Sequence, residues 1–305
     1  MHDEALAAMR RIPGYEDAVP EEVTRLGGLT NRVYRVDVGR QPLVLRIPGE
    51  GTDAYIDREV EAVNARAAAT AGVAPEVLHA DPASGLMLTA HVEGRTMTPD
   101  LFRSVPGAPA RAALAFRQLH RSGVRFAFRF ELFAMVDDYL KVLADLNATL
   151  PEGYFDTLAQ ARAVRDALDA HPAALAPCHC DPLCENFLDT GERMWIVDWE
   201  YSGMNDPLWD LGDLSVEAEF DPGQDDELLA AYFEGPPPAA ARGRMVAYKA
   251  MCDLLWTLWG LIQHANANPA DDFWAYATNR FQRCNRLMRS DAFALHLEAA
   301  RSNEV

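Results

Sequence analysis

The stretch that decides the fold is His179-Cys180-Asp181-Pro182-Leu183-Cys184-Glu185-Asn186, followed by Val197-Asp198-Trp199-Glu200. Asp181 and Asn186 lie five positions apart, and Asp198 ends a short apolar run with the pattern of a buried strand. Phosphoryl transfer needs such a set, because one carboxylate accepts the hydroxyl proton while an amide and a second carboxylate bind magnesium on the nucleotide phosphates. The spacing suits Asp181 as the base and Asn186 and Asp198 as metal ligands. The competing interpretation is a polar turn whose acids only cap and solvate the loop.

Length and composition indicate a globular enzyme with two lobes. The chain has 305 residues, of which 49% are hydrophobic and 24% charged, which is ordinary for such a protein. Met1 is followed by acidic, helix-favouring residues, and no window approaches eighteen uninterrupted apolar residues. We therefore expect neither a secretion signal nor a membrane span, and a cytoplasmic location.

The net charge indicates which classes of partner the protein binds, and the cysteine content indicates the redox state of its thiols. A formal charge of −18 argues against a nucleic-acid partner, because binding there is dominated by attraction to phosphates. It favours a cationic substrate, although acidity for solubility alone is the alternative. The odd number of cysteines, five, indicates reduced thiols. Three of them crowd around His179, but C-x-C-x3-C lacks the paired spacing of structural zinc sites, so packed thiols are the preferred interpretation.

Short strands followed by helices predict an α+β chain. The expected strands are 22–25, 32–38, 43–47, 76–79 and 86–91, with one helix at 54–71. The expected later helices are 108–120, 132–146, 154–170, 208–220, 225–233, 239–264, 271–289 and 292–300. A small β-rich lobe, 1–92, and a larger, mainly helical lobe, 93–305, make up the bilobal plan of the protein-kinase fold.

The amino-terminal third holds candidates for the nucleotide phosphates. Gly27-Gly28 lies between two expected strands and lets backbone amides approach an anion, although a plain hairpin turn is the alternative. Arg46 ends the next strand, and Glu59 follows on a helix, as in the cation and carboxylate pair of kinases. Glu61 competes as the partner of Arg46, but it lies on nearly the opposite side of the helix from Glu59. An exposed Arg and an exposed Glu without a joint role are the remaining alternative.

Several motifs together resemble the choline/ethanolamine kinase family, within the aminoglycoside-phosphotransferase-like branch of the protein-kinase fold. The residues that carry the resemblance are Gly27-Gly28-Leu29-Thr30-Asn31, Val44-Leu45-Arg46-Ile47-Pro48-Gly49, Asp57-Arg58-Glu59, His179-x-Asp181-x4-Asn186, Ile196-Val197-Asp198-Trp199-Glu200-Tyr201 and Asn205-Asp206-Pro207-x2-Asp210-Leu211. The match runs from about residue 25 to residue 285. Family membership implies ATP, Mg²⁺ and an alcohol acceptor.

The resemblance also implies roles for single residues. Asp181 is expected as the catalytic base, Asn186 and Asp198 as magnesium ligands, and Glu200 as a further metal ligand through water. Asp210 resembles the Asp that braces the catalytic loop. The residues expected to bind ATP are Gly28, Thr30, Asn31, Arg46 and Glu59, with the backbone from Ala90 to Val92 against adenine.

The acceptor pocket follows from residues late in the chain. Trp256 and Trp259 share one helix face, Tyr276 follows on the next helix, and Glu217 lies after the metal-binding strand. Three rings and an acid are able to enclose a quaternary ammonium. Alone, W-x-x-W indicates core packing more often; the family resemblance reverses that preference.

The two tryptophans favour choline as the acceptor. The alternatives are ethanolamine, thiamine or an aminoglycoside, and a non-enzymatic pseudokinase scaffold. Trp199 and Phe220 are weaker candidates for the pocket lining. The sequence leaves the oligomeric state open, a homodimer included.

Overall fold

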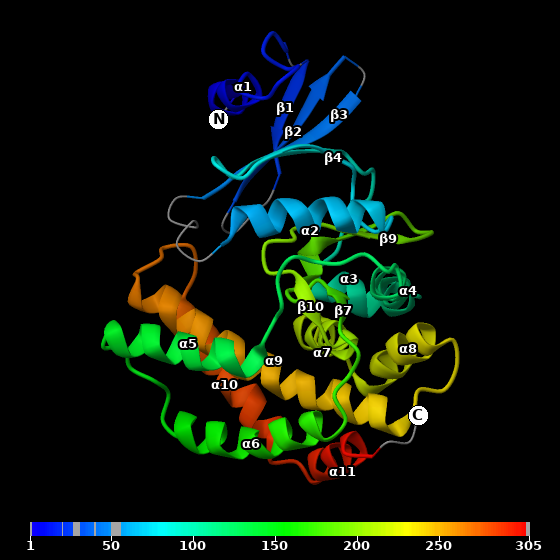
Figure 1. Ribbon diagram of the computed structural model, residues 1–305, viewed down its shortest axis with the longest axis vertical. Helices are drawn as coiled ribbons and strands as arrows, with labels where there is room; N and C mark the ends of the chain where they lie inside the picture. Colours follow the sequence, from blue (N-terminus) through cyan, green and yellow to red (C-terminus); the bar gives the residue numbers. More distant parts are fainter. Residues whose placement is uncertain (1, 20, 27–30, 40, 50–55, 303–305) are drawn as a thin grey trace.

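The upper part of the molecule is a five-stranded antiparallel sheet (Figure 1). The computed structural model describes residues 2–19, 21–26, 31–39, 41–49 and 56–302. The sheet strands are β1 (Glu22–Arg25), β2 (Arg32–Val38), β3 (Gln41–Ile47), β4 (Val77–Asp81) and β5 (Leu86–Ala90), in the order β1-β2-β3-β5-β4. Each differs from its expected range by at most two residues at either end. The alternation of buried and exposed side chains along β2 and β3 gives the sheet one face for a hydrophobic core.

A helix that the sequence interpretation did not include covers this core. Helix α1 (His2–Met9) places Ala5 and Met9 against buried sheet residues such as Tyr34 and Leu45. The Tyr34 hydroxyl also donates a hydrogen bond of 2.9 Å to the Glu4 carboxylate. Helix α1 therefore closes a small core that is separate from the main one.

Helix α2 (Arg58–Thr70) lies between this sheet and the rest of the molecule (Figure 1). The Asp57 side chain caps it by accepting hydrogen bonds from the backbone N–H groups of Glu59 and Val60. The expected beginning of this helix, residues 54 and 55, falls outside the described residues. The cap determines which side chains of the first turn face the interior.

The lower part of the molecule is mainly helical (Figure 1). Its helices are α3 (Pro99–Ser104), α4 (Ala108–His120), α5 (Leu132–Asp145), α6 (Tyr154–Ala170), α7 (Pro207–Glu217), α8 (Pro222–Phe233), α9 (Ala239–Ala265), α10 (Phe273–Met288) and α11 (Asp291–Ala300). Helix α9 packs against α5, α7, α10 and α11. It is long and apolar enough to cross a membrane, but 78% of its most apolar window is buried, as in the core helix of a globular fold.

Two small sheets connect the large sheet to the helices. One consists of β6 (Arg95–Thr96), β8 (Phe187–Asp189) and β9 (Met194–Ile196), and the other of β7 (Ala176–Cys178) and β10 (Gly203–Asn205). The expected α+β, protein-kinase-like class is thus confirmed: a small antiparallel sheet and a larger helical part. The boundary between residues 92 and 93 falls between β5 and β6 and stays a prediction.

Candidate active site

The β8–β9 hairpin brings Asn186 and Asp198 to one end. Its register pairs Phe187 with Ile196, and the backbone N–H of Val197 donates to the Asn186 carbonyl at 2.9 Å. Asn186 precedes one strand and Asp198 follows the other, so two residues twelve positions apart become neighbours. The Asn186 amide donates to the backbone carbonyl of Asp181 at 3.1 Å, which leaves its carbonyl oxygen for another partner.

Asp210 fixes the backbone that precedes Asp181. Its two carboxylate oxygens accept hydrogen bonds of 2.8 Å from the backbone N–H groups of His179 and Cys180. Cys180 has a φ of 67°, in the left-handed region that few non-glycine residues adopt. The Trp209 indole also donates to the Cys180 carbonyl at 3.1 Å. Asp210 therefore holds the catalytic loop, as the resemblance implied. Its buried, charge-assisted hydrogen bonds offset the backbone strain at Cys180.

His179 joins this loop to the strand that carries Asp198. Its ring nitrogen Nε2 lies 2.9 Å from the Val197 carbonyl, which only accepts, so Nε2 is the protonated nitrogen. Burial lowers the pKa of His179, which keeps the imidazole neutral. The ring lies edge-on to Trp199, with centroids 4.8 Å apart. Trp199 contacts Phe126 as well, and Phe220 contacts Phe102, so neither weak pocket candidate is free of the core.

Three carboxyl groups near the hairpin end have raised pKa values. Burial raises the pKa of Asp181 well above its usual range, and the charges of Glu217, Asp198 and Glu200 raise it further. Burial also raises the pKa of Asp198. For Glu200, burial and then Asp198 raise the pKa to about 7. Acids crowded in this way need positive charge to ionise together.

The donor set fits a divalent cation. Carboxylate oxygens of Glu61, Asp198 and Glu200 lie within 4.8 Å of one another. Oxygen Oδ1 of Asp198 is buried and accepts no hydrogen bond from the described residues. Hard oxygen donors from carboxylates and an amide are what Mg²⁺ prefers. Of the residues that the sequence proposed as metal ligands, Asp198 and Glu200 lie in this cluster, and the backbone of Asn186 is hydrogen-bonded to Val197, the residue before Asp198. Their binding of a metal stays a prediction.

The expected pairing of Arg46 with Glu59 is wrong. Arg46 pairs with Glu61, whose side chain is buried, while Glu59 is exposed on the opposite side of α2. Arg58 contacts Glu61 at 2.8 Å as well and reaches Glu200 at 3.4 Å. Burial works against ionisation of Glu61, but Arg46 and Arg58 together lower its pKa. Arg46 also approaches Asp198, at 3.6 Å.

The other expected ATP residues are placed as follows. Gly28 and Thr30 lie outside the described residues. Asn31 is buried, and its amide donates to Glu200 at 3.2 Å. The Ala90 N–H donates to the Glu76 carbonyl, whereas the backbone of Val92 makes no hydrogen bond with the described residues. The contact of this segment with adenine stays a prediction.

The aromatic residues of the expected acceptor pocket form one contiguous cluster. The ring centroids of Trp256 and Trp259 are 6.4 Å apart, and those of Trp259 and Tyr276 are 5.8 Å apart. Tyr201 contacts Trp256 on the other side, with 5.5 Å between centroids. Gly260 permits this arrangement, because a Cβ there would lie 2.6 Å from the Tyr276 ring. Helices α9 and α10 thus approach closely enough to bring the three predicted rings together.

Glu217 is not a free anion, contrary to what the sequence suggested. Arg280 donates to its Oε1 at 2.5 Å and lies 4.6 Å from the centroid of the Tyr276 ring. Arg280 also contacts Asp253 at 3.3 Å. The guanidinium of Arg280 is therefore a positive charge of the protein itself, beside the place where a cationic substrate is expected. Sequence reasoning missed Arg280, although its place one helical turn after Tyr276 is a usable signal.

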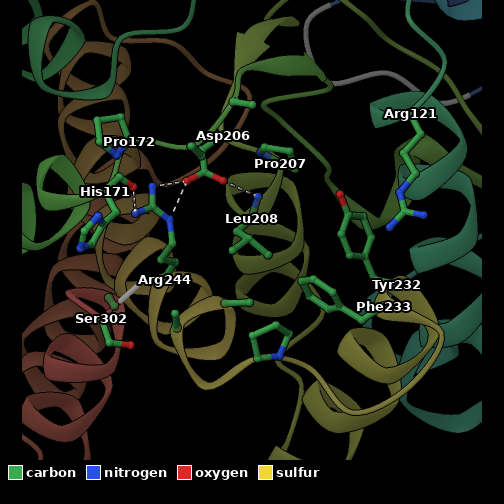
Figure 2. A pocket seen from close by; sticks show the side chains of 16 residues that line it. Arg121, His171, Pro172, Asp206, Pro207, Leu208, Tyr232, Phe233, Arg244 and Ser302 are labelled. Carbon is green, nitrogen blue, oxygen red and sulfur yellow. Dashed lines mark hydrogen bonds and ion pairs between the residues drawn. The ribbon is translucent and has the colours of Figure 1, made fainter. Parts of the chain in front are cut away.

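A pocket of the structure lies away from these residues. It has a volume of about 410 Å³, and no residue proposed for ATP, metal or acceptor lines it (Figure 2). Asp206, Leu208, Tyr232 and Arg244 are among its lining residues. In Figure 2 Arg244 points toward Asp206, which also caps α7 through the backbone N–H of Leu208. Asp206 and Arg244 are thus engaged with each other and with α7, and the pocket is not part of the candidate active site because none of the proposed site residues lines it.

Comparisons with known proteins show the family of the chain. Residues 22–246 match the family model described as phosphotransferase enzyme family. A choline/ethanolamine kinase family protein from Mesorhizobium loti is 62% identical, with a TM-score of 0.91 and coverage of 98% of this chain and 99% of that one.

Two curated relatives are more distant. Protein LicA of Haemophilus influenzae is 27% identical over 86% of this chain and 78% of its own. Ethanolamine kinase 2 of Mus musculus is 26% identical over 83% of this chain and 72% of its own. The chain thus belongs to the phosphotransferase enzyme family and, within it, to the choline/ethanolamine kinases, enzymes that transfer a phosphoryl group to an alcohol.

Proposed function

We propose that this protein transfers the γ-phosphoryl group of ATP to the hydroxyl group of choline, with Asp181 as the general base. The observation that carries the proposal is the convergence of Asp181, Asn186 and Asp198 within one hydrogen-bonded loop and hairpin. Glu217 and the aromatic cluster of Trp256, Trp259 and Tyr276 lie near the same loop, on what we call the acceptor side. The Mesorhizobium loti relative, a choline/ethanolamine kinase family protein, supports this class of acceptor.

The metal and the nucleotide would meet at the hairpin end. Asn186 and Asp198 would hold Mg²⁺ directly and Glu200 through water, and the bound ion would neutralise charge on the transferring phosphoryl group. Arg46 adds positive charge beside Asp198, and its pairing with Glu61 fixes its position. Most of the acceleration then comes from positioning and electrostatic stabilisation, as is general for phosphoryl transfer.

Asp181 would accept the proton of the acceptor hydroxyl. Asp181 is half-buried. Asp210 accepts from the backbone N–H of the preceding residue, Cys180, and the Asn186 amide donates to the Asp181 carbonyl, so the loop is held on both sides of the residue. Burial and neighbouring acids raise its pKa. A raised pKa makes the carboxylate a stronger base once cations nearby allow it to ionise.

The cationic head of choline would lie against the rings of Trp256, Trp259 and Tyr276. Ring faces attract a quaternary ammonium, by about 0.5–2 kcal/mol for each contact when water is excluded. Burial raises the pKa of Tyr276, and the charge of Asp181 raises it further, so the ring lies close to the catalytic loop. The short reach of choline, two carbons between nitrogen and oxygen, suits this proximity.

Ethanolamine is the second candidate acceptor. Acidic side chains are dense on the acceptor side, where Asp213 and Glu217 lie near Cys252. An ammonium group with N–H donors suits such acceptors better than a methylated one. The similarity to an ethanolamine kinase points the same way. We place the reaction in the cytoplasm, in keeping with five buried free thiols.

An acceptor panel tests the proposal. The purified protein is incubated with Mg·ATP and choline, ethanolamine, thiamine or kanamycin, and the phosphorylated product is identified by mass spectrometry. We expect phosphocholine, with phosphoethanolamine as the second product. Phosphorylation of thiamine or kanamycin alone would contradict the proposal, and so would ATP binding without any phosphorylated product.

A further inference from the structure

One face of α7 carries three carboxylates in a row, and the middle one has no assigned role. Asp210, Asp213 and Glu217 follow each other at spacings of three and four residues, so they lie on the same face of the helix. Asp210 holds the backbone of the catalytic loop, and Glu217 pairs with Arg280. On this face Asp213 therefore lies between Asp210, which holds the catalytic loop, and Glu217, which belongs to the predicted cation site.

Asp213 has a buried oxygen that is left without a partner. The residue is fully buried, and the thiol of Cys252 donates to its Oδ1 at 2.8 Å. Its Oδ2 accepts no hydrogen bond from the described residues. A buried carboxylate oxygen in this state is costly unless a donor reaches it. An unpartnered acceptor inside a site is therefore evidence for a ligand that brings donors.

The surroundings of this oxygen are acidic and suit a cation. One ligand atom each of Asp213, Glu217 and Cys252 lie within 4.8 Å of one another. Burial raises the pKa of Asp213, and the charges of Glu217 and Asp181 raise it further, which places both carboxylates near it. Arg280 already occupies Oε1 of Glu217 and lies over Tyr276. Oδ2 of Asp213 is thus a buried oxygen of the cluster that has no hydrogen-bond partner among the described residues.

We propose that Oδ2 of Asp213 accepts an N–H hydrogen bond from a primary ammonium acceptor, and that Asp213 thereby sets the preference between ethanolamine and choline. The proposal rests on the proposed function, since it concerns the acceptor of that same reaction. A primary ammonium has three N–H donors. The trimethylammonium group of choline has none, so the contact discriminates between the two, whereas the aromatic cluster accepts both.

The test measures kcat/KM for ethanolamine, N-methylethanolamine, N,N-dimethylethanolamine and choline, at saturating Mg·ATP. In Asp213→Asn, an amide N–H₂ replaces the open oxygen while the carbonyl still accepts from Cys252. We expect a loss of about tenfold or more for ethanolamine, the fold-change that an unpaired buried polar group commonly causes. The loss should shrink with each added methyl group, and choline should change by less than about threefold.

Asp225→Asn is the matched control. Asp225 is another buried carboxylate, held by Ser215 and Lys249 on the α8 side, outside the site. This variant should leave the order of the four acceptors unchanged. Asp213→Ala serves as a second variant should the first fold poorly, and it must give the same graded pattern.

Two results would overturn the assignment while leaving the proposed function intact. One is an equal loss for all four acceptors in the Asp213 variants, which would mean that Asp213 supplies charge or stability rather than an N–H acceptor. The other is a wild-type protein that phosphorylates choline but not ethanolamine. If none of the four acceptors is phosphorylated, the proposed function itself fails and the assignment fails with it.

Discussion

Arg280 and Glu217 form a buried ion pair, with 2.5 Å between Nη2 and Oε1. Both side chains are nearly inaccessible, and the guanidinium also lies over the Tyr276 ring. The pair joins α10 to the end of α7 at the place where a cationic acceptor is expected. Burial disfavours the charge of Arg280, but Glu217 raises its pKa well above the usual value. The expected acceptor site therefore contains a cation of the chain itself, the guanidinium of Arg280.

Removing this cation should destabilise the fold. In Arg280→Gln, Glu217 and Asp253 lose a buried partner, and we expect the free energy of unfolding to fall by about 3–5 kcal/mol. Arg280→Lys keeps the charge and should lose less. Urea unfolding followed by tryptophan fluorescence measures both. A loss below 1 kcal/mol for Arg280→Gln would show that the pair contributes little to stability.

Glu61, rather than Glu59, should matter for nucleotide use. Glu61 is buried against Arg46 and Arg58, and Glu59 is exposed. We expect Glu61→Gln to raise the KM for ATP or lower kcat, with a combined loss of about tenfold or more in kcat/KM, because Arg46 loses its fixed position.

Glu59→Gln on the same helix is the matched control and should stay within about twofold of wild type, as is usual for an exposed charge. Steady-state kinetics with varied ATP measure both variants. The reverse order of effects would restore the pairing inferred from the sequence and refute the geometry of α2 described above.

Glu200 should make the metal-free protein less stable as the pH rises. Its pKa in the folded protein is about 7, against an ordinary value of 4.5. Between these two values the folded protein keeps a proton that the unfolded chain has lost, so the free energy of unfolding falls with increasing pH in this window. The change amounts to about 3 kcal/mol, and it levels off above pH 7.

Unfolding measured at about pH 5 and about pH 8, without metal, checks this linkage. Glu200→Gln cannot ionise, so the drop between the two pH values should be smaller in that variant. Saturating Mg·ATP should also reduce the drop, because bound cations favour the charged carboxylates. An equal drop in wild type and Glu200→Gln would assign the pH dependence to other groups.

Much of this site could be predicted because its spacing is local. A hairpin between Asn186 and Asp198 determines their separation, so the sequence pattern alone indicates that they meet. The rotation of α2 about its axis was harder to predict, because it depends on Asp57 as the N-cap. Without knowledge of that cap, Glu59 and Glu61 are equally good candidates for the partner of Arg46. A helix start that shifts by one residue turns every side chain by about 100°.

Contacts between distant helices were less accessible to sequence reasoning. The rings of Trp256, Trp259 and Tyr276 share a short segment and were found, whereas Arg280 and Asp213 were not. Arg280 was missed because a basic residue is not expected beside a cation site. Asp213 was missed because a single Asp inside α7 matches no sequence motif. Both become visible only through burial, charge pairing and an unpartnered oxygen.

The most direct test of the account is Asp181→Asn, studied by Mg·ATP binding and by single-turnover transfer to choline. Asn186 and Asp198 remain, so the affinity for Mg·ATP should stay within about threefold of wild type, while transfer should fall by about 10²–10⁴-fold, the usual contribution of a general base. Transfer within about tenfold of wild type would contradict the account.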